Sequence, residues 1–140
     1  MSARHDGLLD TSTLILLSRL RASDLPEHPS ITAVSLAELS VGPLATDDPT
    51  QRAIRQVLLQ EVESAFDPIP FDSAAARSFG RVATSLRLAG RKPAARAFDA
   101  LIAATAIANE LDLYTCNPRD FDGIEELNLV AIPHPDSPTV

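Results

Sequence analysis

The chain has 140 residues, a length that suits one domain with a hydrophobic core of its own. With 45% hydrophobic and 22% charged residues it is too apolar for a disordered polymer, and no apolar stretch approaches the roughly 20 residues of a membrane-spanning helix. The single cysteine, Cys116, excludes an internal disulfide and a zinc site built from cysteines. Because residues 1–7 lack the apolar core of a signal peptide, the expected compartment is the reducing cytoplasm.

The charges are unevenly distributed along the chain. The formal net charge of −7 by itself argues against a nucleic-acid-binding protein. Residues 73–98, however, contain no acidic side chain and six basic ones: Arg77, Arg81, Arg87, Arg91, Lys92 and Arg96. This segment predicts one basic face on an otherwise acidic protein. The alternative is that its arginines only reflect a GC-rich coding sequence.

The first half of the chain predicts two strand–turn–helix units. Residues 7–10 form a short apolar run, after which leucines recur at the spacing of a helix: Leu14, Leu17 and Leu20. A β-branched run over residues 30–34 predicts the second strand, and Ser35 begins the helix that follows it. A turn rich in proline and aspartate then separates that helix from a long one over residues 50–64, so we expect a helical hairpin.

The second half predicts two more helices and a return to the sheet. Residues 66–71 contain two prolines and can form only a short strand at a sheet edge. A helix capped by Asp72 or Ser73 should end at Gly90 in a left-handed cap. An alanine-rich helix over residues 96–111 is expected to turn Phe98 inward. The last two predicted strands are residues 113–115 and 128–132.

Strands that alternate with helices predict an α/β fold, a three-layer domain with a short, largely parallel β-sheet flanked by helices. Residues 1–133 should form this single domain and residues 134–140 a mobile tail. Ligands of parallel sheets bind beyond the carboxyl ends of the strands. Four acids lie in segments that can reach this edge: Asp10, Glu38, Asp99 and Asp120.

Taken singly, each of the four acids also has an ordinary structural interpretation. Asp10 could be a turn residue, and Glu38 could close a helix-capping box that begins at Ser35. Asp99 could favour a helix N-terminus through the helix dipole, and Asp120 could cap a short helical turn. Only the joint pattern of the acids and its spacing indicate a site.

That joint pattern resembles the four motifs of the PIN-domain ribonucleases, in order and in spacing. The matching blocks are Leu8-Leu-Asp10-Thr-Ser12, Val34-Ser-Leu-Ala-Glu38-Leu, Phe98-Asp99-Ala-Leu-Ile-Ala-Ala-Thr105-Ala and Thr115-Cys-Asn117-Pro-Arg-Asp120-Phe121. The resemblance extends from about residue 7 to residue 133 and is greatest to the VapC-type toxins. It implies a PIN-like fold and a metal-dependent endoribonuclease that hydrolyses RNA phosphodiester bonds.

The resemblance also implies roles for the acids. Asp10 and Asp99 are expected to be direct metal ligands, and Glu38 is either a ligand or the group that accepts a proton from the attacking water. Asp120 is expected as the fourth catalytic acid and as a metal ligand, although Asn117 could complete the metal site in its place. Ligands that offer only oxygen atoms favour Mg²⁺ or Mn²⁺. The number of metal ions, one or two, stays open.

Three polar residues adjoin these acids in sequence. Ser12 and Thr115 could orient the acids or a bound water, although both are also ordinary turn hydroxyls. Many relatives have an acid where this chain has Asn117. That amide is expected to act as a neutral ligand or to orient Asp120 by hydrogen bonding.

The expected partners are RNA and protein. The candidates for RNA binding are Arg77, Arg81, Arg87, Arg91 and Arg96, because phosphate contacts supply most sequence-independent affinity. VapC-type toxins form homodimers and are held inactive by a cognate VapB-like antitoxin, so the resemblance implies both kinds of contact.

Two other classes of protein remain as alternatives. A PIN-like domain that has lost activity would serve only for binding, and Asn117 is the one hint in that direction. A phosphoacceptor or haloacid-dehalogenase-like domain also gathers acids at such an edge. Against it, Asp10 is followed by Thr11 and Ser12 rather than by further acids, and the only lysine is Lys92.

Overall fold

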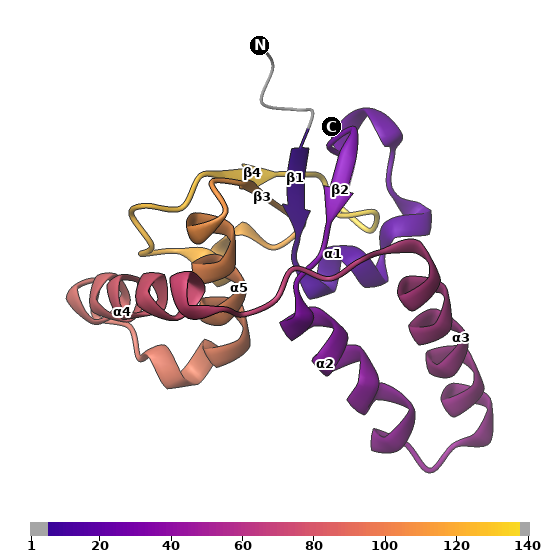
Figure 1. Cartoon of the computed structure of the whole chain (residues 1–140). Helices are drawn as coiled ribbons and strands as arrows, with labels where there is room; N and C mark the ends of the chain where they lie inside the picture. The colour runs from indigo at the N-terminus through magenta and orange to yellow at the C-terminus, as the bar shows by residue number, and fades with distance from the viewer. Residues whose placement is uncertain (1–5, 138–140) are drawn as a thin grey trace.

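The computed structural model describes residues 6–137 (Figure 1). Its sheet has the strand order β2-β1-β3-β4, and every neighbouring pair of strands is parallel. The strands are β1 (Asp6–Leu9), β2 (His28–Ser30), β3 (Asp112–Thr115) and β4 (Leu129–Ala131). The predicted α/β fold with a short parallel sheet is therefore confirmed.

The helices of the described residues surround this sheet. They are α1 (Thr11–Ile15), α2 (Ala33–Val41), α3 (Pro49–Ala65), α4 (Ser73–Leu88) and α5 (Ala97–Ala108). Short 3₁₀ turns connect them: η1 (Leu17–Arg19), η2 (Ala22–Asp24), η3 (Gly42–Ala45), η4 (Pro93–Arg96) and η5 (Pro118–Phe121). Figure 1 shows α4 and α5 packed together on one side, with α2 and α3 forming the predicted hairpin on the other. Among the described residues, none of the helices combines the length and the apolar composition that crossing a bilayer requires.

Alternating side chains of the central strands divide the core in two. Leu8 and Leu113 belong to the cluster under α4 and α5. Their neighbours Leu9 and Tyr114 belong to the cluster that packs against α1, α2 and α3. Because successive residues of a strand point to opposite faces, two strands only four residues long supply apolar side chains to both layers.

The second strand and its helix lie earlier in the chain than predicted. The strand is His28–Ser30 rather than residues 30–34, and α2 begins at Ala33. The cause is Thr32, whose hydroxyl accepts a hydrogen bond from the Ser35 amide at 3.1 Å and so caps the helix. Pro29 is tolerated because β2 is an edge strand that pairs only with β1.

Two other predicted elements are shorter than expected. The predicted helix of Leu14, Leu17 and Leu20 divides into α1 and the 3₁₀ turn η1. The predicted strand over residues 66–71 is a single bridge, in which Ile69 pairs with Thr32. The prolines on either side of Ile69 have no amide hydrogen, so they cannot extend the ladder.

The alanine-rich helix α5 is buried because its side chains are small. Ala100, Ala103, Ala104 and Ala106 are at most 1% exposed, so the helix lies close to both the sheet and α4. Phe98 does not turn inward as predicted; it is 54% exposed. It belongs to the first turn of α5, before the run of small residues that allows close packing.

The end of α4 agrees with the prediction, and the predicted C-terminal tail is described only in part. Gly90 has φ +77° just after α4, which is the expected left-handed cap. Of the predicted tail, residues 134–137 are described, and Asp136 forms an ion pair with Arg19. Residues 138–140 lie outside the described residues.

A close approach of two strands explains the glycine at position 7. A Cβ atom there would lie 2.5 Å from the Tyr114 ring and 2.9 Å from Cβ of Pro26. Such distances are far below van der Waals contact, and the neighbours are themselves buried in the sheet layer. Gly7 thus lets the Tyr114 ring lie flat against β1.

Gly7→Ala should lower the free energy of unfolding by about 1–3 kcal/mol, because the added methyl group overpacks this contact. Urea denaturation measures the effect. The control is Gly80→Ala in α4, where a Cβ would meet nothing within 4 Å. That change should raise the free energy of unfolding by about 0.5–1 kcal/mol through helix propensity. Equal stability of the two variants would contradict the packing argument.

Candidate active site

Asp10 lies where β1 ends, and its carboxylate is held from three directions. The side chain is the N-cap of α1, with Oδ1 accepting a hydrogen bond from the Thr13 amide at 3.2 Å. Oδ2 accepts hydrogen bonds from the hydroxyls of Ser12 at 2.9 Å and Thr115 at 3.0 Å. The residue is 2% exposed, and burial raises the pKa of its carboxyl although these hydrogen bonds oppose the shift. Asp10 is therefore a buried acid of fixed orientation.

Asn117 acts on Asp10 indirectly. Its side-chain nitrogen donates to the Ser12 hydroxyl at 2.9 Å, and that hydroxyl in turn donates to Asp10. Its backbone amide donates to the Thr115 hydroxyl at 2.9 Å. The Asn117 side chain contacts Ser12 and not Asp120, whereas its backbone carbonyl accepts a hydrogen bond from the Asp120 amide at 3.0 Å.

Glu38 reaches the site from the middle of α2. The Thr11 hydroxyl donates to Oε1 of Glu38 at 2.6 Å and lies 2.8 Å from the Ser35 hydroxyl. Since the single Thr11 proton serves the carboxylate, Ser35 is the donor in the second contact. Burial raises the pKa of Glu38, and the charge of Asp10 raises it further. The capping-box interpretation of Ser35 and Glu38 is wrong, because the helix is capped by Thr32.

Arg96 joins the two remaining acids. Its Nη1 lies 2.9 Å from Oδ1 of Asp120, which precedes the last residue of η5. The same nitrogen lies 3.8 Å from Oδ2 of Asp99, in the first turn of α5. Both acid side chains are 23% exposed, whereas that of Arg96 is 52% exposed. Asp120 is thus neutralised by an arginine rather than acting as a helix cap.

The charges of the other three acids act on Asp99. Its pKa is raised to about 6, first by burial and then by the negative charges of Asp120, Asp10 and Glu38, while Arg96 lowers it. The acids that the sequence predicted as one site do come together, at the carboxyl ends of β1 and β3 and beside α2 and α5.

The four carboxylates are suitable ligands for a hard divalent cation, although they are not close enough together to form a complete metal site. Within residues 6–137, no three histidine, cysteine, aspartate or glutamate side chains form a group that could hold a metal ion as they lie. Carboxylate oxygens alone are nevertheless the ligands that Mg²⁺ and Mn²⁺ prefer. The raised pKa of Asp99 shows negative charge that a cation would stabilise.

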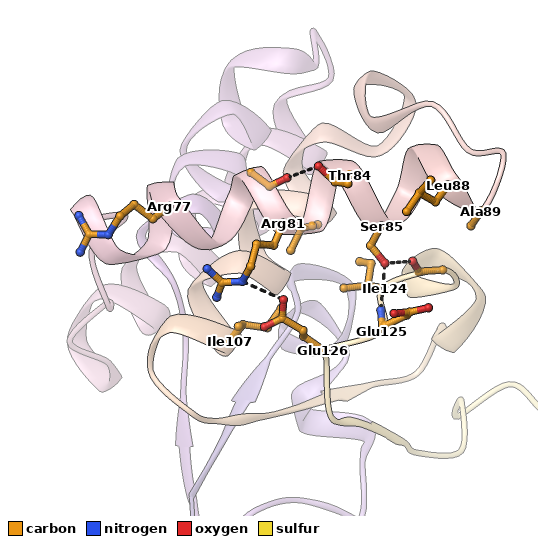
Figure 2. Close-up of a pocket in the computed structure, with 13 residues that line it drawn as sticks. Arg77, Arg81, Thr84, Ser85, Leu88, Ala89, Ile107, Ile124, Glu125 and Glu126 are labelled. Carbon is orange, nitrogen blue, oxygen red and sulfur yellow. Dashed lines mark hydrogen bonds and ion pairs between the residues drawn. The ribbon is translucent and has the colours of Figure 1, made fainter.

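The predicted RNA-binding arginines divide into separate groups. Arg77 and Arg81 are exposed, as predicted, and line a groove of about 570 Å³ between α4 and residues 123–126 (Figure 2). Arg81 forms an ion pair with Glu126 there, at 2.8 Å. Arg91 and Arg96 line a smaller pocket that includes Asp120, whereas Arg87 is exposed and lines neither. The two arginines nearest the acids are therefore those at the end of the basic segment.

Sequence reasoning missed two residues that shape the site. Thr11 and Ser35 hold Glu38 through a chain of hydroxyl groups. The signal available in the sequence was the position of Thr11 directly after Asp10, from which its hydroxyl can reach α2. Ser35 gave no such signal, because its role depends on Thr32 being the N-cap of α2, three residues before Ser35.

Comparisons with known proteins agree with this arrangement. The model of the PIN domain matches residues 8–127. Ribonuclease VapC5 of Mycobacterium tuberculosis is 34% identical over 132 residues, which cover 90% of this chain and 95% of that protein. Ribonuclease VapC8 of the same species is 38% identical over 101 residues, covering 71% of this chain and 89% of the relative.

A solved structure of the same group has the same fold. The crystal structure of VapBC-5, a toxin–antitoxin system of M. tuberculosis, matches with a TM-score of 0.79 and 32% identity, covering 91% of this chain and 99% of the matched chain. The chain belongs to the PIN-domain family. Within it, the chain belongs to the VapC ribonucleases, the toxins of VapBC toxin–antitoxin systems.

The raised pKa of Asp99 predicts how stability depends on pH without metal. Folding shifts this pKa from 3.8 to about 6, so between these values the folded protein binds a proton that the unfolded chain releases. The free energy of unfolding should therefore fall as the pH rises from about 4 to about 6, by on the order of 2 kcal/mol. Thermal denaturation in chelator across this range measures it.

Asp99→Asn should flatten this pH dependence and raise stability at pH 7. The matched control is Asp47→Asn, which removes the same charge from an exposed loop. A pH profile that is the same in both variants would show that repulsion at Asp99 is not the cause.

Proposed function

We propose that this protein is a metal-dependent endoribonuclease that uses Asp10, Glu38 and Asp99 as its catalytic acids, with Asp120 in a lesser role. The observation that supports this most strongly is the pKa of Asp99, which the charges of all three other acids raise. Such repulsion has no benefit for folding and is characteristic of functional sites. The family supplies the reaction class, since its members named above are ribonucleases.

Mg²⁺ or Mn²⁺ is the proposed cofactor. Asp10 and Asp99 would be its direct ligands, because one directly follows β1 and the other lies in the first turn of α5, at the same edge of the sheet. The chemistry that the ion supplies when bound is polarisation of the phosphoryl group and activation of a water molecule. The protein keeps Asp10 ready for this role by the hydrogen bonds from Ser12, Thr13 and Thr115.

Glu38 is suited to accept a proton. Its carboxyl is partly buried, with a raised pKa, and a proton acceptor works best when its pKa approaches the working pH. Only Oε1 is engaged, by Thr11, and within residues 6–137 no hydrogen bond or ion pair holds Oε2. Thr11 and Ser35 therefore position the group without blocking it.

Asp120 and Arg96 contribute charge balance in this proposal. Arg96 neutralises Asp120 and lies close to Asp99, so it offsets the repulsion that a phosphate would meet at the acids. A cation bound by Asp120 would have to compete with this arginine. For that reason Asp120 is the acid that contributes least to metal binding in this proposal. The proposed ligand of Arg91 and Arg96 is RNA.

The proposed protein partners are a cognate VapB-like antitoxin and a second copy of the chain. The support is the family: the matched structure is that of a toxin–antitoxin system. An arginine-bearing antitoxin segment would be attracted to the acidic site. The α2–α3 hairpin adds exposed apolar side chains that a protein partner could cover: Val41, Leu44, Ile54 and Val57. The proposed place of action is the cytoplasm, where RNA substrates of such an enzyme are found.

RNA cleavage by the purified protein should require Mg²⁺ or Mn²⁺ and stop in excess chelator, because the acids alone have no means of stabilising charge on the phosphoryl group. A water nucleophile should leave a 5′-phosphate and a 3′-hydroxyl, which end-labelling detects. A 2′,3′-cyclic phosphate product would contradict the mechanism. Binding of Mn²⁺ without cleavage of any RNA would favour the inactive PIN-like alternative.

Asp10→Asn and Asp99→Asn should each lower the rate of metal-dependent cleavage at least about 100-fold while the fold is retained. Asp120→Asn should lower it only about 10-fold, because Arg96 already engages that carboxylate. Circular dichroism and cleavage assays on the same samples separate folding from activity, with Asp47→Asn as the control. An equal loss at Asp120 would mean that Arg96 releases it for catalysis.

A further inference from the structure

A second, smaller pocket adjoins the acidic site on the side of the basic segment. Its volume is about 220 Å³, and it lies between the end of α4, η4, the start of α5 and η5. Leu86, Ala100 and Ile124 contribute its apolar lining, and Asp120 is shared with the acidic site. The volume is below that of pockets for drug-sized ligands, so it suits one small unit of a longer molecule.

The lining of this pocket has an excess of positive charge. Arg91, Lys92 and Arg96 are its cations, and Asp120 is its single acid. Arg96 is neutralised by its contact with Asp120 at 2.9 Å. Two positive charges therefore remain in a pocket of a protein whose net charge is −7.

The two remaining cations differ in how they are held. Arg91 donates through Nη1 to the backbone carbonyls of Asp122 at 2.6 Å and Arg119 at 3.2 Å, so its charge is fixed in place but not cancelled. Lys92 is exposed, and its ammonium group has no hydrogen bond or ion pair within residues 6–137. Its ammonium group is the one cation of the pocket that is free to meet a ligand.

We infer that this pocket is a subsite for one phosphate and its ribose on the RNA strand, next to the phosphate held at the acids, with Lys92 as its main contact. The inference rests on the proposed function. The apolar lining suits the face of a sugar, and the two uncancelled charges suit a phosphate. Because the pocket and the acidic site share Asp120 and Arg96, a strand that occupies one continues into the other.

An acidic peptide is the competing occupant, and the position of the pocket disfavours it. Asp99 and Asp120 would repel the carboxylates of such a peptide and the phosphates of RNA alike, so charge alone does not separate the two occupants. An RNA strand already brings a phosphate to this place for cleavage. The geometry therefore favours a single-stranded RNA backbone as the occupant.

The test compares two variants that each remove one positive charge, both in the Asp10→Asn background to prevent cleavage. Lys92→Gln changes the pocket, and Arg21→Gln changes an exposed cation directly before η2 that does not line the pocket. The probe is a short single-stranded RNA that the native protein cleaves. Its dissociation constant is measured by fluorescence anisotropy from low to moderate salt.

Lys92→Gln should reduce the logarithmic salt slope of RNA binding by about 0.7, the value for one phosphate contact on a single strand, and Arg21→Gln should leave it unchanged. The probe is then remade with a neutral methylphosphonate at each position in turn. A methylphosphonate at one position beside the cleavage site should weaken binding to the protein that retains Lys92. The same substitution in the RNA should have no further effect on binding to the Lys92→Gln protein.

Equal salt slopes for the two variants, or no position that depends on Lys92, would overturn the subsite while RNA cleavage by the native protein still stood. Binding of a labelled polyglutamate peptide that is lost in Lys92→Gln, while RNA binding by that variant is unchanged, would assign the pocket to a protein ligand instead. Absence of any RNA binding in the Asp10→Asn background, together with absence of cleavage by the native protein, would overturn both the subsite and the proposed function.

Discussion

The burial of one carboxylate at the end of the central strand is the constraint on which the rest of the site depends. Asp10 is 2% exposed, and a charge so placed is costly unless donors surround it. The hydroxyls of Ser12 and Thr115 and the amide of Thr13 supply them, which ties β1, α1 and β3 to one another. Folding therefore fixes the acid before any ligand arrives.

The other three acids are held near Asp10 by different interactions on the two sides of the sheet. On the side of α2, the acid Glu38 is joined to the β1–α1 turn by hydroxyl groups, a short-range and uncharged connection. On the side of α5, the acids Asp99 and Asp120 are bridged by the positive charge of Arg96. Small alanine side chains make the second arrangement possible, because they let α5 lie close to the sheet while its first turn stays at the surface.

The features that sequence predicted are those that depend on local pattern. Asp10 follows an apolar run and Asp99 begins an alanine-rich helix, so their places at the sheet edge follow from the strand and helix that carry them. The start of α2 was missed for a local reason, because Ser35 and Glu38 have the spacing of a capping box although Thr32 is the cap. The helical spacing of α5 does not show that its first turn, with Phe98, stays at the surface. Features that depend on contacts between distant segments could not be predicted. The pairing of Arg96 with Asp120 required the fold itself.

Arg91 donates hydrogen bonds to the carbonyls of Arg119 and Asp122, in the turn that carries Asp120. The site therefore has two parts that are held differently, one at Asp10 and one at Asp120. The sheet immobilises Asp10, whereas the turn that carries Asp120 is fastened by a side chain from the connection between α4 and α5. Substitutions in that connection can move the fourth acid without disturbing the core. The turn that carries Asp120 can thus change its position while the strand that carries Asp10 stays as it is.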